Sequence, residues 1–142
     1  MMDWSIWMRT CINEAMLSLP QDVPVSALIL DMQYRTLIQT HNQREKLKRV
    51  SAHAEILAIE QLKDTTSTLT LITTLQPCLM CTSAILDCHN ISRVVFGAYD
   101  QEPQLIYATD LLIEKGIEVV GGVLENDCAK LLKDYFASIR LP

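Results

Sequence analysis

The sequence predicts a three-layer α/β/α sandwich around a five-stranded mixed sheet. Helical and strand-like stretches alternate along the chain in the order αββαβαβαβα. Two of the strand-like stretches, "LTLITTL" at 69–75 and "RVVFGA" at 93–98, are mostly apolar, which is typical of central strands covered on both faces. A length of 142 residues with 49% hydrophobic residues suits one compact domain. We therefore expect a single α/β domain over residues 1–142.

The first elements are a helix and a pair of strands. Apolar side chains in residues 4–18 follow the i, i+3, i+4 spacing of a helix that Pro20 ends. The expected core positions of this helix are Trp4, Trp7, Met8, Cys11, Ile12, Ala15 and Met16. Residues 23–32 and 35–40 predict two strands joined by a short turn near Asp31.

The remaining elements alternate regularly between helix and strand. The patterns predict a helix at 52–64, a strand at 67–75, a helix from Pro77 to about Cys88, a strand at 91–99, a helix at 104–115, a strand at 117–123 and a helix at 125–139. No repeat or low-complexity linker interrupts this order, which supports the single-domain prediction.

Charge and cysteine content restrict the class of protein. The net charge is −5 and the pI is about 5.1, so the overall field repels phosphate backbones unless basic residues gather locally. Five cysteines with one close pair favour metal-binding or core cysteines over a disulfide framework. No secretory signal pattern and no run of about 18 apolar residues stands in the sequence, so we expect a cytoplasmic protein.

Two short motifs place metal-binding side chains at the starts of predicted helices. Cys78 and Cys81 would project from one face of a first turn if Pro77 is the first helical residue, and a helix N-terminus stabilises thiolates. His53 begins another helix, with Ser51 as its expected cap. One histidine and two cysteines leave one tetrahedral position of a zinc ion open, which is typical of a catalytic site.

Glu55 is the candidate catalytic residue. It stands two positions after His53, near enough to reach a zinc-bound water without coordinating the metal. Zinc lowers the pKa of its bound water towards neutrality, and a carboxylate beside that water can carry its proton to a leaving group.

These motifs resemble a known signature. His-Ala-Glu at 53–55 followed by Pro-Cys-x-x-Cys at 77–81 is similar to the signature of zinc-dependent nucleobase deaminases, the cytidine/deoxycytidylate deaminase superfamily. Within it the chain most resembles the bacterial tRNA-specific adenosine deaminases, from about residue 4 to 139. The most similar stretches are "VPVSALI", "SAHAEILAI", "PCLMC" and "ISRVVFGAYD". Gln76 and Ser26 stand where that family commonly has glutamate and glycine, and the stretch 101–110 lacks its Thr-Gly-rich loop.

The resemblance implies the fold, the cofactor, the reaction and the partners. The fold would be cytidine-deaminase-like, with one Zn²⁺ per chain. The reaction would convert adenosine to inosine and ammonia by hydrolysis at the wobble position of a tRNA anticodon arm. The family also implies a homodimer. Carried over by position, His53, Cys78 and Cys81 would bind zinc, Glu55 would move protons, and Val23, Asn42, Leu75 and the backbone N–H of Ala54 would line the base pocket.

A basic stretch lies between Asn42 and His53. Four of the twelve basic residues of the chain fall within six positions there, namely Arg44, Lys46, Lys48 and Arg49. They form either a solvated loop or a rim that binds RNA phosphates. Asp100 aligns with an aspartate near the RNA-facing loop of the family, and is equally explained as an acidic turn residue.

Two alternatives to the tRNA enzyme stay open. The first is a deaminase of a free base or nucleoside such as cytosine, cytidine or guanine, because "TTLQPCLMCTSAI" also resembles fungal cytosine deaminase. The second is a non-catalytic zinc-stabilised module, which would need a fourth protein ligand, and Cys88 is the one nearby candidate. His41 and His89 are expected to be surface or core residues, and Cys11 and Cys128 small core side chains.

Overall fold

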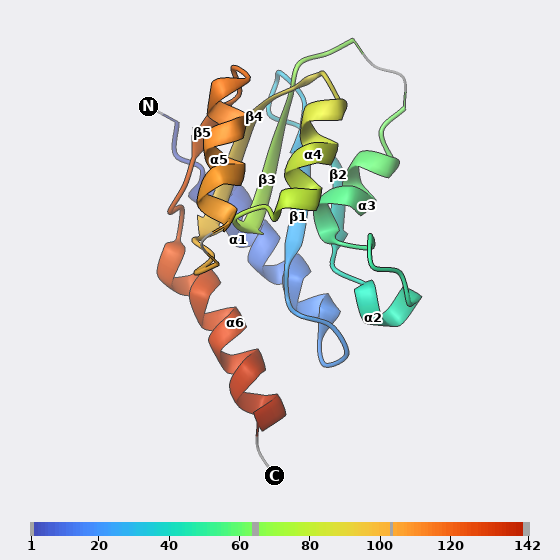
Figure 1. Cartoon of the computed structure of the whole chain (residues 1–142), viewed down its shortest axis with the longest axis vertical. Helices are drawn as coiled ribbons and strands as arrows, with labels where there is room; N and C mark the ends of the chain where they lie inside the picture. The colour runs from blue at the N-terminus through green and yellow to red at the C-terminus, as the bar shows by residue number, and fades with distance from the viewer. Residues whose placement is uncertain (1, 64–65, 103, 141–142) are drawn as a thin grey trace.

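The computed structural model describes residues 2–63, 66–102 and 104–140, without the side chains of 104–106. In this part of the chain five strands form one sheet in the order β2-β1-β3-β4-β5 (Figure 1). The strands are β1 (Ser26–Leu30), β2 (Thr36–His41), β3 (Leu69–Leu75), β4 (Ile91–Ala98) and β5 (Glu118–Val120). β1 pairs antiparallel with β2 and β3, whereas β3, β4 and β5 are parallel, so the predicted mixed sheet is confirmed.

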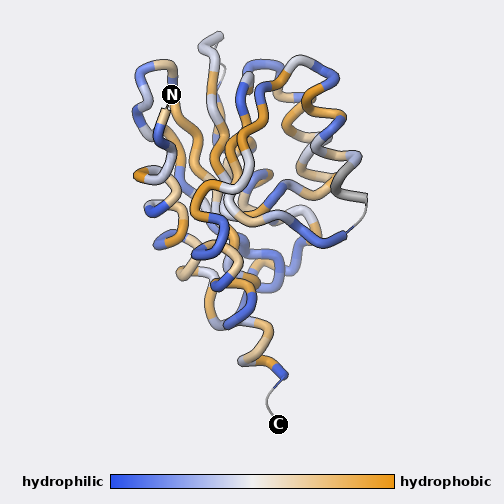
Figure 2. Tube along the Cα trace, turned by 90° about the vertical axis from the view of Figure 1, so that its left-hand side faces the viewer, coloured by the Kyte–Doolittle hydropathy of each residue, from blue (hydrophilic) through white to orange (hydrophobic). Residues whose placement is uncertain are grey.

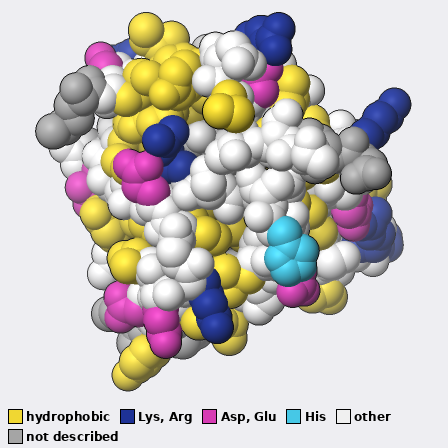
Figure 3. All heavy atoms as spheres, turned by 90° about the horizontal axis from the view of Figure 1, so that it is seen from above, with side chains coloured by type: hydrophobic (Ala, Val, Ile, Leu, Met, Phe, Trp, Pro, Cys, Tyr) yellow, Lys and Arg dark blue, Asp and Glu magenta, His cyan; other side chains and the backbone are white. Residues whose placement is uncertain are grey.

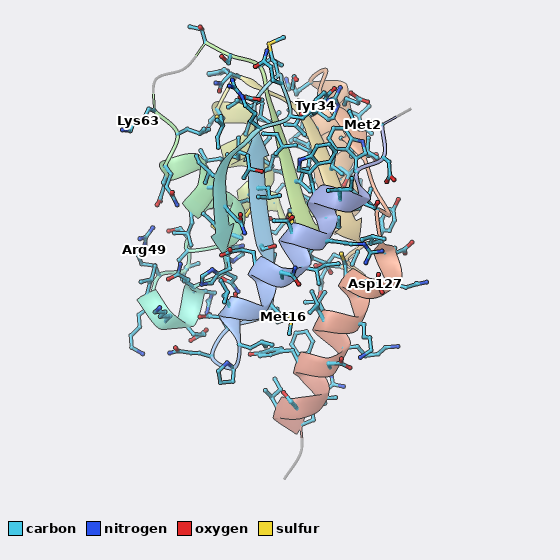
Figure 4. All side chains as sticks on the ribbon, turned by 180° about the vertical axis from the view of Figure 1, so that it is seen from behind. Met2, Met16, Tyr34, Arg49, Lys63 and Asp127 are labelled. Carbon is cyan, nitrogen blue, oxygen red and sulfur yellow. The ribbon has the colours of Figure 1, made fainter. Side chains whose placement is uncertain are left out.

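Helices cover both faces of the sheet, which confirms the predicted three-layer sandwich. They are α1 (Ser5–Ala15), the 3₁₀ turn η1 (Met16–Ser18), α2 (Arg44–Leu47), α3 (Ala54–Glu60), α4 (Leu79–Asp87), α5 (Gln104–Glu114) and α6 (Glu125–Arg140). α1 and α6 lie on one face, and α3, α4 and α5 lie on the other (Figures 1 and 4). Among the described helices, none is long and apolar enough to cross a membrane.

The alternation of side chains along β1 separates two hydrophobic cores. Ala27 and Ile29 pack with Ala58 of α3, whereas Leu28 and Leu30 pack on the opposite face with Met8 of α1. Figure 2 shows the hydrophobic residues concentrated along the strands in the middle of the molecule. A strand covered on both faces is mostly apolar, as the sequences of β3 and β4 predicted.

The structure corrects two details of the predicted elements, one in the first helix and one in the last strand. Met16 was expected in the core but is 52% exposed, because it lies in η1 at the lower end of α1, beyond the sheet (Figure 4). The last strand ends at Val120 rather than at residue 123, before Gly122, whose φ of +83° does not continue a strand. Cys11 and Cys128 are buried as expected, and His89 is exposed.

Gly97 of β4 has no room for a side chain. A Cβ at this position of β4 would lie 2.3 Å from Cys128 Sγ and 2.8 Å from the carbonyl oxygen of Thr74. Since that carbonyl belongs to the neighbouring strand, it cannot move aside without disturbing the sheet.

We predict that Gly97→Ala lowers the free energy of unfolding by about 2 kcal/mol through this overpacking. Urea denaturation followed by circular dichroism measures the loss. Ser92→Ala, an exposed change on the same strand, is the control and should shift stability by less than about 0.5 kcal/mol. Equal stability of the two variants would contradict the packing argument.

Candidate metal centre and active site

The candidate site lies where two helices begin beside the C-terminal end of β3. β3 ends at Leu75, and the chain reaches Cys78 at the start of α4 after three further residues. α3 begins next to this point, with His53 just before it and Glu55 in its first turn. Ligand sites of open α/β sheets form at the carboxyl ends of strands, because the loops that follow them are free to carry functional side chains.

Cys78 caps α4 with its own sulfur. The helix begins at Leu79, so the expectation that Pro77 is the first helical residue was wrong. Cys78 is the N-cap, with extended backbone, and its Sγ accepts the N–H of Cys81 at 3.5 Å. The sulfur thus takes the place of the oxygen that usually satisfies a free helix N–H. Both cysteines still lie on one turn, as expected.

His53 is the N-cap of α3, so the expected cap Ser51 was also wrong. The backbone of His53 is extended, and its carbonyl accepts the N–H of Leu57 at 2.9 Å. Its side chain makes no capping hydrogen bond and is free to point towards the cysteines. The start of α3 is held on the sheet by Thr40 of β2, whose hydroxyl donates to the carbonyl of Ala54 at 2.7 Å.

The three side chains form the donor set of a metal ion. His53 Nδ1 lies 3.6 Å from Cys78 Sγ and 3.5 Å from Cys81 Sγ. Ligands on two corners of a tetrahedral zinc site lie about 3.6 Å apart, given typical Zn–S and Zn–N bond lengths. Within the described residues this is the only group of three or more such donors that converges, and Cys88 is not part of it. The donor set therefore fits one zinc ion with three protein ligands.

Hydrogen bonds favour the ionised form of the Cys78 thiol. Hydrogen bonds from Cys81 and His53 lower the pKa of the Cys78 thiol to about 4, so it is ionised at neutral pH. The same hydrogen bond to Cys78 raises the pKa of Cys81, and the contact with Cys78 raises the pKa of His53. A thiolate is the form in which cysteine binds a metal, so the cluster is poised to receive one.

Glu55 is a buried carboxyl group beside these donors. Its side chain is 4% exposed, and this burial raises its pKa to about 7. A group with a pKa near neutrality both accepts and releases protons readily, which suits proton transfer.

A cavity of about 210 Å³ opens beside this centre. Its walls are formed by Val23, Val25, Asn42, Arg44, His53, Ala54, Glu55, Leu75, Gln76, Cys78 and Asp100. The four residues expected to line a base pocket are therefore brought together here with Glu55. The structure adds Val25 and Gln76 to the pocket wall. The sequence offered one signal for each: both are neighbours of expected pocket residues, two positions from Val23 and one from Leu75.

Only one of the four basic residues of the 43–50 stretch lines the cavity. Arg44 lines the cavity, whereas Lys46, Lys48 and Arg49 do not. All four are exposed, and Arg49 pairs with Glu60 of α3 at 3.1 Å on the outer side of the α2 turn (Figure 4). Asp100 borders the cavity from the loop after β4.

An α/β/α sandwich with a His-Cys-Cys donor set and an adjacent buried glutamate defines a zinc-dependent hydrolase of the deaminase class. Residues 2–98 match the family described as the cytidine and deoxycytidylate deaminase zinc-binding region. A tRNA-specific adenosine deaminase of Bacillus subtilis (strain 168) is 32% identical over 146 residues, covering 95% of this chain and 89% of the relative. The chain belongs to the cytidine and deoxycytidylate deaminase family.

Solved structures share the fold. The guanine deaminase from Nitrosomonas europaea superposes with a TM-score of 0.79 at 22% identity, over 92% of this chain and 82% of that one. A structure from studies of A-to-I editing by tRNA:A34 deaminases gives a TM-score of 0.73 at 24% identity, over 89% and 99% of the two chains. The similarity to these two structures establishes the fold of the chain and does not identify the base that it deaminates.

We predict that Cys78→Ala and Cys81→Ala each reduce bound zinc from about one ion per chain to a small fraction, because two remaining ligands hold zinc weakly. Metal analysis of the purified variants measures this. Cys88→Ala is the matched control and should keep its zinc, since the Cys88 thiol donates to Asn90 Oδ1 and lies outside the donor set. Loss of zinc from this control would instead indicate a fourth protein ligand.

Proposed function

We propose that this protein deaminates adenosine to inosine in tRNA, at the wobble position of the anticodon arm. The observation that carries the proposal is a cavity of about 210 Å³, large enough for a single base, whose wall includes His53 and Cys78 of the donor set, Glu55, and Arg44 of the basic turn. The identity of 32% to a relative named a tRNA-specific adenosine deaminase supports the same substrate. A base flipped out of an RNA strand would enter the cavity while the strand stays outside.

In this proposal Glu55 moves the protons of the reaction. Zinc bound by His53, Cys78 and Cys81 acts as the Lewis acid that acidifies water. The carboxylate of Glu55 takes a proton from the water that adds to C6 of adenine and gives it to N1. It then takes the proton of the new C6 hydroxyl and delivers it to the departing amine, so that adenosine and water yield inosine and ammonia.

The remaining pocket residues would orient the base. Val23 and Leu75 offer apolar contacts to its faces. The N–H of Ala54 stands in the first turn of α3, where no intrahelical carbonyl accepts it, so it is available to an acceptor on the base. Asn42 Nδ2 donates to the carbonyl of Val23 at 3.1 Å, which fixes the amide at the cavity wall.

We also propose that the protein acts as a homodimer in the cytoplasm, where a tRNA substrate would be found. Leu79 of α4 and Tyr107 of α5 are 51% and 74% exposed on neighbouring helices. Burying such side chains against a second copy would be favourable.

We predict that Glu55→Gln retains zinc, fold and RNA affinity while turnover falls by about two to four orders of magnitude, because the amide cannot accept and release the proton. Ammonia release and RNA binding are measured in parallel. Glu114→Gln, an exposed change at the end of α5, should match the parent. If Glu55→Gln keeps turnover within a few-fold of the parent, another residue moves the proton.

The substrate is tested directly by offering two classes of compound. Pure protein is incubated with an anticodon stem-loop RNA bearing a wobble adenosine and, separately, with cytosine, cytidine, adenine and guanine. We expect ammonia from the RNA alone. Release from one of the free compounds and none from the RNA would overturn the proposal in favour of a small-molecule deaminase.

The basic stretch supplies an independent prediction. Replacing Arg44, Lys46, Lys48 and Arg49 by glutamine should weaken RNA binding. It should also flatten the slope of log K against log salt concentration by about 0.7 for each lost phosphate contact. Affinity across a salt series measures both effects. The charge-matched control replaces four exposed lysines elsewhere, Lys63, Lys115, Lys130 and Lys133. Equal slopes for parent and variant would exclude the stretch from RNA binding.

A further inference from the structure

The basic turn α2 has little to hold it in place apart from polar contacts. None of the residues of α2 is buried, and the turn ends at Lys48 in a left-handed conformation with φ of +53°. A four-residue helix is too short to be stable by itself. Contacts from outside the turn must therefore determine where its cations lie.

Side chains outside α2 accept the N–H groups of its first three residues. The carboxylate of Asp22 accepts the N–H of Glu45 through Oδ1 at 2.6 Å and that of Lys46 through Oδ2 at 3.1 Å. Asn42 Oδ1 accepts the N–H of Arg44 at 3.1 Å. The N-cap residue Gln43 makes no side-chain capping bond. Asp22 thus caps the turn from a distant loop, in the place of a conventional N-cap.

Asp22 is itself firmly anchored. It is 2% exposed, and its backbone N–H donates to the carbonyl of Ser18 at 2.9 Å. The hydroxyl of Ser18 in turn donates to the carbonyl of Asn42 at 2.8 Å. The next residue, Val23, lines the cavity. The carboxylate therefore connects the cavity wall to the basic turn through two partly buried hydrogen bonds.

We propose that Asp22 is a positioning residue that holds α2, and with it Arg44, at the mouth of the cavity for contact with substrate phosphates. The proposal rests on the RNA substrate proposed above. Asp22 acts through the turn and makes no contact with substrate. Removing an anion near an RNA-binding site normally strengthens RNA binding. Removing Asp22 should instead weaken it, because the cations of α2 would no longer be held in place.

The test compares Asp22→Ala with Asp87→Ala, which removes the same charge from an exposed position at the far end of α4. With the anticodon stem-loop RNA, Asp22→Ala should raise KM about tenfold, leave kcat within about twofold and flatten the salt slope. Asp87→Ala should leave KM unchanged or lower it. If the KM of Asp22→Ala is at or below that of the parent, the proposal is overturned. It is also overturned if Asp22→Ala loses kcat and bound zinc together, because the substitution would then have damaged the metal centre.

Amide hydrogen exchange separates this proposal from the proposed substrate. Exchange at Glu45 and Lys46 should quicken in Asp22→Ala and stay slow in Asp87→Ala, with or without RNA. If the parent does not deaminate RNA, the proposed function fails, while quickened exchange still supports the positioning role. Unchanged exchange overturns it. If Asp22→Ala does not fold, Asp22→Asn, which keeps one acceptor oxygen, should show the same changes to a smaller degree.

Discussion

The structure depends on the convergence of two helix starts at the end of β3. The donor atoms of His53, Cys78 and Cys81 lie within 4.8 Å of one another, although they come from segments more than twenty residues apart. Hydrogen bonds to flanking strands set the two starts: Thr40 of β2 holds the first turn of α3, and the N–H of Gln76 donates to the carbonyl of Ala98 at 2.9 Å. The cores on both sides of the sheet keep these strands in register, so the metal centre is a product of the whole sheet.

The two residues that depart from the family pattern, Ser26 and Gln76, both form hydrogen bonds that hold neighbouring elements together. Ser26 is fully buried, and its hydroxyl donates to the carbonyl of Cys11 in α1, which satisfies a polar group that glycine would lack. Gln76 accepts the N–H of Asp100 through Oε1 and donates to Thr109 Oγ1 through Nε2. Through these two hydrogen bonds the amide joins the loop after β4 to α5.

Charge is distributed unevenly over the chain. The chain is acidic overall, with a net charge of −5, but four cations stand within residues 44–49, and one of them, Arg44, lines the cavity. At the opposite end of the sheet, basic side chains are interspersed with acidic ones (Figure 3). The arrangement of charges beside the cavity therefore differs from the overall acidic balance of the chain.

The sequence by itself determined the order of elements, the mixed sheet and the donor motif. Periodicity and motif spacing depend on neighbours two to four positions away, and this information is fully present in the chain. The tertiary structure decided where α3 and α4 begin, so the expectations for Ser51 and Pro77 failed: His53 and Cys78 take the N-cap positions, from which their side chains meet across the site. It also formed α2, whose sequence has no apolar pattern and whose first N–H groups are accepted by the side chains of Asn42 and Asp22. Val25 and Gln76 joined the cavity for the same reason: a pocket wall is assembled through space from several strands and loops.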